Sequence, residues 1–341
     1  EAPSYVLDVV RFWAQEYHVD GVRLVGYAPV KLLGEDPYLS RLKLLAPGWD
    51  GVEPGQEKHL AEYNDGFMMD MRSFLKGDED QLNRLVYHIR HNPGQVGVVN
   101  YMANTNGFTL MDMVSYDTKH NEANGEENRD GTDYNQSWNC GVEGPSRKKR
   151  IMQMRRKQIR NALLMLFLSQ GTPLLLAGDE FGNSQEGNNN AYCQDNRISW
   201  LDWSFLEKNW DHFSYTKHMI AFRKAHDVIR KPSGVCSLGL PNIKVIPPDG
   251  STHVLAVLYS GRNRTDTADD LVCLAVNVYW EPQAFLLPMV SKSLKWKVEA
   301  DTAGTYLKDH MPSSHVPPCL ISSPQITLES RSVLVFTAAP A

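Results

Sequence analysis

Residues 146–182 read SRKKRIMQMRRKQIRNALLMLFLSQGTPLLLAGDEFG, a helical pattern that runs directly into an apolar segment. Residues 146–170 form the longest predicted helix, which is basic at its start and apolar later. Gly171-Thr-Pro173 ends this helix, because proline cannot continue it. Residues 174–182 then read as a short buried strand that runs into polar residues. The stretch therefore predicts one helix-then-strand unit of an α/β fold.

Similar units precede it along the chain. Residues 18–28, 42–50 and 95–108 read as strands, and residues 4–17 and 61–76 read as helices. Strands that alternate with helices, with polar residues just after each strand, favour a parallel sheet. We therefore expect a parallel α/β domain in the first two thirds of the chain.

The pattern changes after Lys231-Pro-Ser-Gly234. Residues 236–341 contain alternating runs such as HVLAVLYSG and LVCLAVNVYW, which are separated by Pro, Gly, Ser and Asp and show almost no helical spacing. This pattern predicts an antiparallel β-sandwich. We expect two domains, residues 1–233 and residues 234–341.

Composition excludes several classes of protein. The 341 residues are 42% hydrophobic and carry a net charge of −5, so nothing draws the whole chain to nucleic acid or to an anionic membrane. The strongest apolar run, residues 163–168, is far shorter than the roughly 20 residues that span a bilayer. Five scattered cysteines fit reduced, cytoplasm-like surroundings, and no metal-ligand spacing is present. We expect no cofactor, no metal, no nucleic-acid partner and no membrane partner.

Candidate ligand-binding residues follow the predicted strands. The segment after the last strand reads GNNNAYCQDN, in which Asn189, Asn190, Tyr192 and Asp195 combine amides, an aromatic ring and a carboxylate. Sugar hydroxyls require dense hydrogen bonding beside a flat apolar face. From residue types alone, however, such a run also fits a simple turn.

A resemblance supports the sugar interpretation. AGDEFGNSQEGNNNAYCQDNRISWLDW (residues 177–203) and YDTKHNEANGEENRDGTDYNQSWNCGVEG (residues 116–144) resemble the isoamylase and glycogen-debranching branch of the α-amylase superfamily, glycoside hydrolase family 13. The resemblance implies the C-terminal part of a (β/α)8 barrel, about strands 4–8, followed by an all-β antiparallel sandwich. It also implies an α-glucan such as glycogen or starch as the ligand. Because the family's fourth-strand motif already occurs at residues 18–25, we expect the given sequence to be a fragment.

The family's three catalytic carboxylates are substituted at the matching positions. Val25 occupies the position of the nucleophile, Pro47 that of the acid/base and Asn106 that of the third carboxylate. The resemblance leaves Arg23, Trp49 and Asp50 as substrate-binding candidates beside these positions, together with the loop residues named above. A retaining glycosidase needs two carboxyl groups about 5–5.5 Å apart, and neither Val nor Pro can supply one. We therefore expect no catalytic residue of the family type in this chain.

Three functions remain open at this point. The first is a catalytically inactive homologue that binds α-glucan or assists an active debranching enzyme. The second is an active α-1,6-glucosidase that uses displaced carboxylates such as Asp50, and the third is a purely structural module.

Because Val25 removes the usual charge partner of Arg23, we expect Arg23 to pair with another carboxylate, such as Asp50, or to lie in a hydrated pocket. The basic cluster of residues 147–150, 155–157 and 160 suggests phosphate or nucleic acid as one alternative, but it is interpreted as the solvated face of a helix because the chain is acidic overall.

Overall fold

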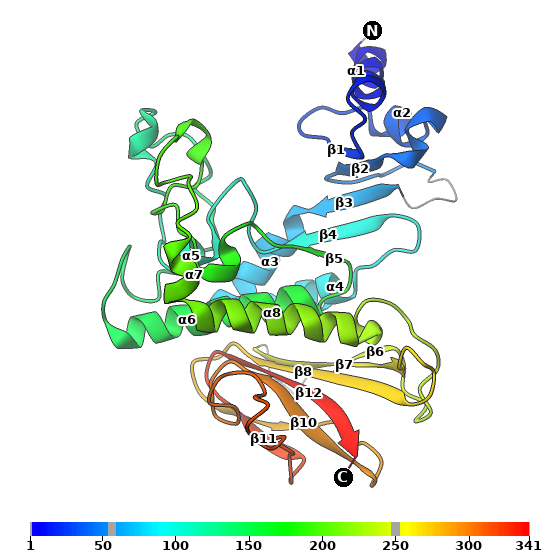
Figure 1. Ribbon diagram of the computed structural model, residues 1–341, viewed down its shortest axis with the longest axis vertical. Coiled ribbons are helices and arrows are strands. Elements are labelled where there is room, and N and C mark those ends of the chain that lie inside the picture. Colours follow the sequence, from blue (N-terminus) through cyan, green and yellow to red (C-terminus); the bar gives the residue numbers. More distant parts are fainter. Residues whose placement is uncertain (1, 54–58, 247–252, 341) are drawn as a thin grey trace. The chain divides into compact units, whose positions relative to one another are not determined.

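Two β-sheets of different type organise the computed structural model, which describes residues 2–53, 59–246 and 253–340. The chain divides into two compact units. Unit 1 comprises Glu1–Met68, His91–Tyr101 and Gln170–Leu174, and unit 2 comprises Met69–Arg90, Met102–Ser169 and Leu175–Ala341. Figure 1 labels their helices and strands.

Unit 1 contains a five-stranded parallel sheet whose spatial order equals the chain order. Its strands are β1 (Gly21–Arg23), β2 (Lys43–Ala46), β3 (Leu60–Asn64), β4 (Gly97–Tyr101) and β5 (Thr172–Leu174). Helices α1 (Ala2–Glu16) and α2 (Val30–Gly34) lie in the same unit. Leu7 and Val10 of α1 pack with Leu44 of β2 and Leu60 of β3 in one buried cluster. The parallel α/β arrangement predicted from alternating strands and helices is therefore confirmed.

Two strands differ from the prediction. Residues 61–76 read as one helix, but Leu60–Asn64 pairs between β2 and β4, and the helix begins only at Asp65. The last parallel strand is Thr172–Leu174 instead of residues 174–182. It ends there because its ladder with β4 covers only three residues, and Asp179–Phe181 then forms a 3₁₀ turn. The fold class stands, although both strand positions were wrong.

The remaining helices have clear bounds. They are α3 (Asp65–Lys76), α4 (Leu82–Arg90), α5 (Leu110–Met113), α6 (Lys149–Leu168), α7 (Ser204–Lys208) and α8 (Trp210–Ala225). The predicted long helix corresponds to α6, and its C-terminal half from Gln158 to Leu168 is buried without interruption. Figure 1 shows α6 and α8 running alongside each other in unit 2.

Unit 2 also contains the antiparallel β-structure. A five-stranded sheet has the order β10-β12-β8-β7-β6, and β9 and β11 form a separate antiparallel pair. The bounds are β6 (Ile243–Ile246), β7 (Val254–Arg262), β8 (Asp269–Asn277), β9 (Gln283–Leu286), β10 (Leu294–Asp301), β11 (Gln325–Leu328) and β12 (Ser332–Pro340). The all-β C-terminal region is confirmed. The predicted boundary at residues 233/234 falls inside unit 2, between Ile229 and β6, and stays a prediction.

The larger sheet is buried on both faces. Val254, Ala256 and Leu258 of β7 face the sandwich core, in which they pack with Trp296 and Phe336. The residues between them point the other way because side chains alternate along a strand. Tyr259 on that second face donates a hydrogen bond to the carbonyl of Leu168, the last residue of α6. The sheet therefore has an apolar core on one face and contacts the helices on the other.

Within the described ranges, none of the helices combines the length and the apolar character needed to cross a membrane.

Candidate functional site

Polar and aromatic side chains meet at the carboxyl ends of the strands in unit 1. The guanidinium carbon of Arg23 lies 3.7 Å from the centroid of the Tyr63 ring, a cation–π contact. Tyr63 and Tyr101 have ring centroids 4.8 Å apart, and the Tyr101 hydroxyl donates to Asp65. Burial raises the pKa of Tyr101, and the adjacent Asp65 carboxylate raises it further. Arg23 itself is exposed, and no described carboxylate forms an ion pair with it, so an aromatic face stands where a carboxylate pair was expected.

The three residues that the resemblance matches to the family's catalytic carboxylates all lie at the surface. In unit 1, the Val25 side chain is 72% exposed and Pro47 is exposed as well. In unit 2, Asn106 is exposed, and its backbone N–H donates to the Asn104 side chain at 2.8 Å. Val and Pro offer neither a nucleophile nor a proton donor, and the Asn amide carries no charge.

Trp49 and Asp50 follow β2 but have different environments. Trp49 is 7% exposed, its indole N–H donates to the carbonyl of Ala61 at 2.9 Å, and its ring belongs to the core of unit 1. The ring therefore fills the core and offers no open stacking face. Asp50 is exposed and available to a ligand.

In unit 2, two distant loops are joined by paired asparagines. The Asn121 amide donates to the side chain of Asn189 at 2.9 Å and accepts from its backbone N–H, also at 2.9 Å. Asn189 donates in turn to the carbonyl of Thr132 and to the side chain of Asn135. With 3% of its surface exposed, Asn189 holds loops together and has no free polar atom to offer a sugar. We call the two loops, residues 119–135 and 187–196, the clasped loops.

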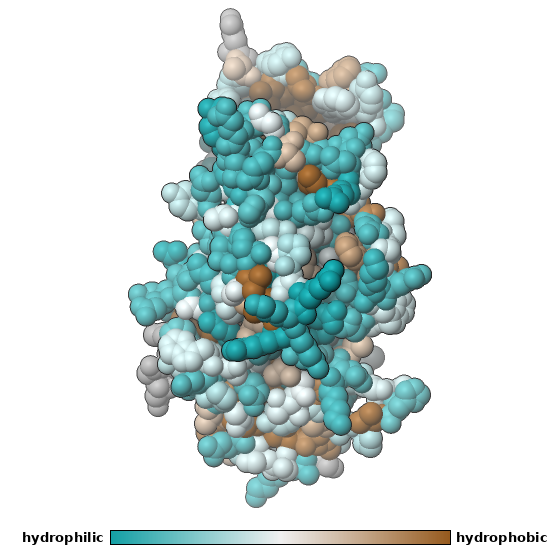
Figure 2. Space-filling view, turned by 90° about the vertical axis from the view of Figure 1, so that its left-hand side faces the viewer, coloured by the Kyte–Doolittle hydropathy of each residue, from teal (hydrophilic) through white to brown (hydrophobic). Residues whose placement is uncertain are grey.

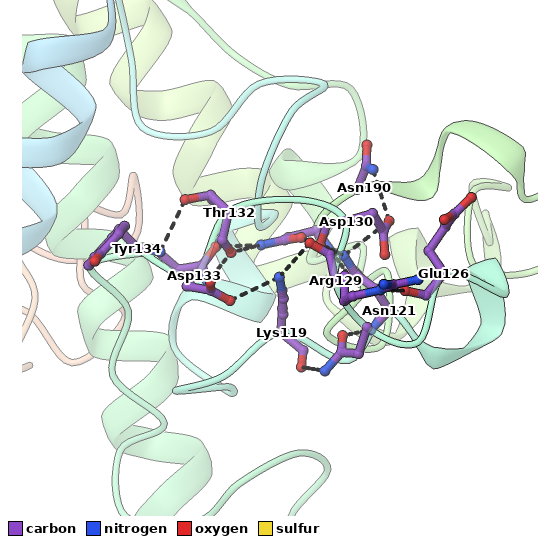
Figure 3. A network of polar contacts seen from close by, with 12 residues as sticks. Lys119, Asn121, Glu126, Arg129, Asp130, Thr132, Asp133, Tyr134 and Asn190 are labelled. Atoms are coloured by element: carbon purple, nitrogen blue, oxygen red, sulfur yellow. Dashed lines mark hydrogen bonds and ion pairs between the residues drawn. The ribbon is translucent and has the colours of Figure 1, made fainter.

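Asp130 provides a second link between the clasped loops. Its carboxylate accepts from Asn124 at 2.7 Å and from Asn190 at 2.9 Å, and these bonds hold the pKa of Asp130 below its usual range. Figure 3 shows this carboxylate between Asn121 and Asn190, with the Lys119–Asp133 ion pair beside it. Asn190 therefore positions the second loop against the first.

The clasp leaves several large side chains exposed. Tyr192 is 69% exposed and Trp200 is 60% exposed, and the Trp200 indole N–H donates to the Asp195 carboxylate at 3.0 Å. Trp203 and Tyr134 are exposed to a similar degree. Flat aromatic faces beside a carboxylate and amides suit a ligand with apolar ring faces and many hydroxyl groups.

Two buried carboxyl groups hold the segments that precede the clasped residues 187–196. Asp112 of α5 accepts from the Ser184 hydroxyl at 2.5 Å and from the Gln185 N–H at 2.8 Å. Asp179 accepts from the Leu110 N–H at 2.9 Å. Burial raises the pKa of Asp112 to about 6 and that of Asp179 to about 8. Buried carboxyls that bind backbone groups in this way support a loop and do not face a ligand.

Sequence reasoning missed the partners that hold the clasped loops. It selected Asn189 and Asn190 but not Asn121, Asn124 or Asp130, which lie about 60 to 70 residues earlier. The segment 121–135 is rich in Asn, Asp and Gly, and this was the available signal. That composition also fits an ordinary turn, so pairing between the two loops requires the structure. Among the described residues, no group of three or more His, Cys, Asp or Glu side chains is arranged to hold a metal ion.

Comparisons with known proteins identify relatives. No family model matches the chain. It is 40% identical over 247 residues to a glycogen debranching enzyme of Serratia proteamaculans, covering 65% of this chain and 37% of that protein. It is 38% identical over 349 residues to a glycogen operon protein GlgX homolog of Haemophilus influenzae, covering 89% of this chain and 50% of the relative. The chain thus spans about a third to a half of the length of these curated relatives.

Solved structures share the fold. A pullulanase type I from Bacillus subtilis, crystallised in complex with maltose, superposes with a TM-score of 0.65 at 19% identity over 98% of this chain and 46% of the pullulanase. At this identity the likeness establishes the fold alone: the back part of a (β/α)8 barrel followed by an antiparallel sandwich. The sequence relatives and the shared fold agree, and the chain belongs to the isoamylase and glycogen-debranching branch of the α-amylase superfamily.

Proposed function

We propose that this chain is a debranching-enzyme homologue that binds α-glucan without hydrolysing it by the family's two-carboxylate mechanism. The observation that carries the proposal is the set of residues at the three catalytic positions, Val25, Pro47 and Asn106. Losing one member of a catalytic group that acts as a unit costs on the order of 10⁴–10⁶ in rate. Here the nucleophile and the acid/base are both missing, so binding and positioning are what remain.

Displaced carboxylates do not restore a catalytic pair in unit 1. Asp65 is occupied by the Tyr101 hydroxyl, and Glu62 by His91 at 2.8 Å. Asp50 is exposed and has no ion pair among the described residues. A retaining or an inverting glycosidase needs two carboxyl groups at a defined separation, and one free carboxylate cannot supply both roles.

We propose a separate set of glucan-binding residues in each unit. In unit 1 these are Arg23 and Asp50, and in unit 2 they are Tyr192 and Asp195, on the loop that Asn189 and Asn190 hold. The maltose bound by the related pullulanase supports a short α-glucan as the ligand class. A place beside an active debranching enzyme, and a cytoplasmic location, remain proposals that follow from the names of the relatives.

Affinity electrophoresis in glycogen-containing gels tests the binding. We expect the protein to be retarded, and the double variant Tyr192→Ala/Trp200→Ala to bind about five- to 150-fold more weakly, because each of the two exposed rings contributes on the order of 0.5–1.5 kcal/mol of stacking. Trp280→Ala is the matched control, since Trp280 is 63% exposed on the β-sandwich outside the proposed surface. Unretarded migration of the unaltered protein would exclude glucan binding.

A reducing-end assay on pullulan and glycogen tests the loss of hydrolysis. We expect no turnover above a protein-free blank. Turnover that disappears in an Asp50→Ala variant would identify an active hydrolase with a displaced carboxylate and would refute the proposal.

A further inference from the structure

Five basic side chains form an exposed patch around the start of α6. We call Arg147, Lys148, Lys149, Arg150 and Arg156 the basic patch. All five are exposed, and none of them forms an ion pair or a side-chain hydrogen bond within the described part of the chain. The protein as a whole carries a net charge of −5, so the patch is a local reversal of its charge.

The cationic residues next to the basic patch donate hydrogen bonds to backbone carbonyls, whereas the side chains of the patch do not do so anywhere in the described ranges. Arg155 is 2% exposed and donates to the carbonyls of Asn139 and Val142. Lys157 donates to the carbonyl of Ser330 at 2.7 Å. Arg155 and Lys157 therefore have structural roles on α6, whereas the five side chains of the basic patch have none toward the described residues.

Among the residues that the structure describes, no carboxylate forms an ion pair with the basic patch. The acidic residue that precedes it, Glu143, accepts from the Asp117 N–H at 2.8 Å, from Asn139 at 3.0 Å and from His120 at 3.0 Å. Burial acts to raise the pKa of Glu143, but these hydrogen bonds outweigh it and lower the pKa to about 2. The Glu143 carboxylate is therefore ionised and already bound by groups of the loop at residues 117–120.

Helix stability does not account for the patch either. The first turn of α6 contains no acidic residue, and the N-cap residue Lys148 makes no capping hydrogen bond with its side chain. Cations in this position oppose the helix dipole and repel one another, so they destabilise the helix slightly. Side chains that the fold does not need are candidates for contact with an external anion.

The segment that precedes the patch contacts the clasped loops within unit 2. Glu143 accepts a hydrogen bond from His120 of the first clasped loop, and Arg155 ties Asn139 and Val142 to α6 through their carbonyls. In Figure 1, α6 begins on the left, on the side where these loops lie, and Figure 2 shows that the surface seen from that side is largely hydrophilic. The patch and the clasped loops therefore lie on the same side of unit 2.

We propose that the basic patch binds phosphate monoesters carried on the α-glucan. The inference rests on the proposed function, because a neutral glucan gains nothing from five uncompensated cations. Guanidinium groups match the oxygens of a phosphate in a bidentate geometry, and lysines add charge. The net negative charge of the protein disfavours a long polyanion such as nucleic acid, whereas isolated phosphate groups on a neutral polymer meet only the patch.

The test compares retardation in two gels that differ only in phosphate. One gel contains potato amylopectin, whose glucose units carry phosphate, and the other contains the same material after phosphatase treatment. We expect stronger retardation in the phosphorylated gel, and a gain in affinity of about tenfold that shrinks as salt is added, because exposed charges are screened. Retardation in the dephosphorylated gel measures glucan binding by itself.

Two charge-matched variants locate the effect. Arg147→Gln/Lys148→Gln/Lys149→Gln/Arg150→Gln should lose the gain and keep its retardation in the dephosphorylated gel. The control Lys224→Gln/Lys231→Gln/Lys292→Gln/Lys295→Gln removes four exposed lysines elsewhere and should keep the gain. Thermal unfolding confirms that both variants fold, which the exposure of the altered residues favours.

Each result decides the question. Equal retardation of the unaltered protein in both gels, or loss of the gain in the control variant, overturns the phosphate proposal and leaves glucan binding intact. Absence of retardation in either gel overturns both. Abolition of the gain by added inorganic phosphate at a concentration no higher than that of the glucan phosphate identifies free phosphate as the ligand. Tighter retention by DNA-cellulose than by the phosphorylated gel identifies nucleic acid, and both of these results refute the proposal.

Discussion

At the scale of single residues, Arg23 makes a contact different from the carboxylate pair that the family resemblance implied. Arg23 without its carboxylate rests on the ring of Tyr63, a contact worth about 0.5–1 kcal/mol at an exposed site. Because Arg23 remains in contact with water, the large penalty of a buried unpaired charge does not arise. The residues Val25 and Pro47 therefore leave no uncompensated charge of Arg23 in the core of unit 1.

The buried carboxyl of Asp179 leads to a prediction about pH. Its pKa is raised by burial to about 8 in the folded protein, whereas in the unfolded chain it ionises near the ordinary value of 3.8. Between these two values the unfolded chain binds fewer protons, so the free energy of unfolding falls as pH rises, by about 1.4 kcal/mol per pH unit. Asp179→Asn keeps the acceptor for the Leu110 N–H and removes this dependence.

Urea unfolding between pH 4.5 and pH 8 measures the effect. We expect Asp179→Asn to have a shallower pH dependence than the unaltered protein and to be the more stable of the two at pH 8. Asp112 and His212 contribute equally in both proteins, with the raised pKa of Asp112 acting in the same direction and the lowered pKa of His212 in the opposite one. Asp309→Asn, at an exposed position, should leave the slope unchanged. A slope that Asp179→Asn does not alter would refute the assignment.

At the scale of elements, sequence periodicity located the helices and the sandwich strands better than the short parallel strands. The apolar half of α6 is buried as its pattern indicates, and the alternating runs form β7 and β8. Residues 60–64 read LAEYN and lead without a break into an amphipathic helix, so nothing local marks them as a strand. Their state depends on pairing with β2 and β4, which is tertiary information.

The candidate site shows the same division. The family resemblance, and not residue spacing alone, pointed to the matched carboxylate positions and to the loop that carries Tyr192. The pairing of Asn121 with Asn189 joins side chains 68 residues apart and has no signature in either loop alone. Trp49 and Asn189 show most clearly what the sequence alone does not decide. An aromatic or amide side chain can pack in a core or bind a ligand, and only the burial of Trp49 and Asn189 in the structure distinguishes the two roles.

The clasped loops give the prediction at this scale. Asn121→Ala removes four hydrogen bonds, to the Asn189 side chain, to the Asn189 N–H, to the Asp130 carbonyl and to the Asp130 carboxylate. At roughly 1 kcal/mol each, their loss should raise the amide hydrogen exchange of residues 187–196 by about tenfold or more. Asn263→Ala, in the turn between β7 and β8, also removes a local network and should not affect that loop. Unchanged exchange of residues 187–196 in Asn121→Ala would show that the clasp does not hold it.

At the scale of the whole molecule, unit 2 joins barrel-type helices and the sandwich into one folded body. The last carbonyls of a helix have no partner within the helix and must be satisfied elsewhere. At the end of α6, Arg223 of α8 donates to the carbonyls of Phe167 and Ser169, and Tyr259 of β7 donates to that of Leu168. Three different elements therefore meet at one helix end, which couples the sandwich to the helices through buried polar contacts.

This junction should make the two parts of unit 2 unfold together. Tyr259 is fully buried, so Tyr259→Phe leaves the Leu168 carbonyl without a partner and should lower the free energy of unfolding by about 1–2 kcal/mol. Because the junction links helix and sheet, hydrogen exchange should rise together in residues 160–168 and in β7. Tyr38→Phe, which removes a half-exposed hydroxyl in unit 1, should change neither quantity. Faster exchange confined to β7, with α6 unaffected, would mean that the sandwich opens independently and that the junction does not couple them.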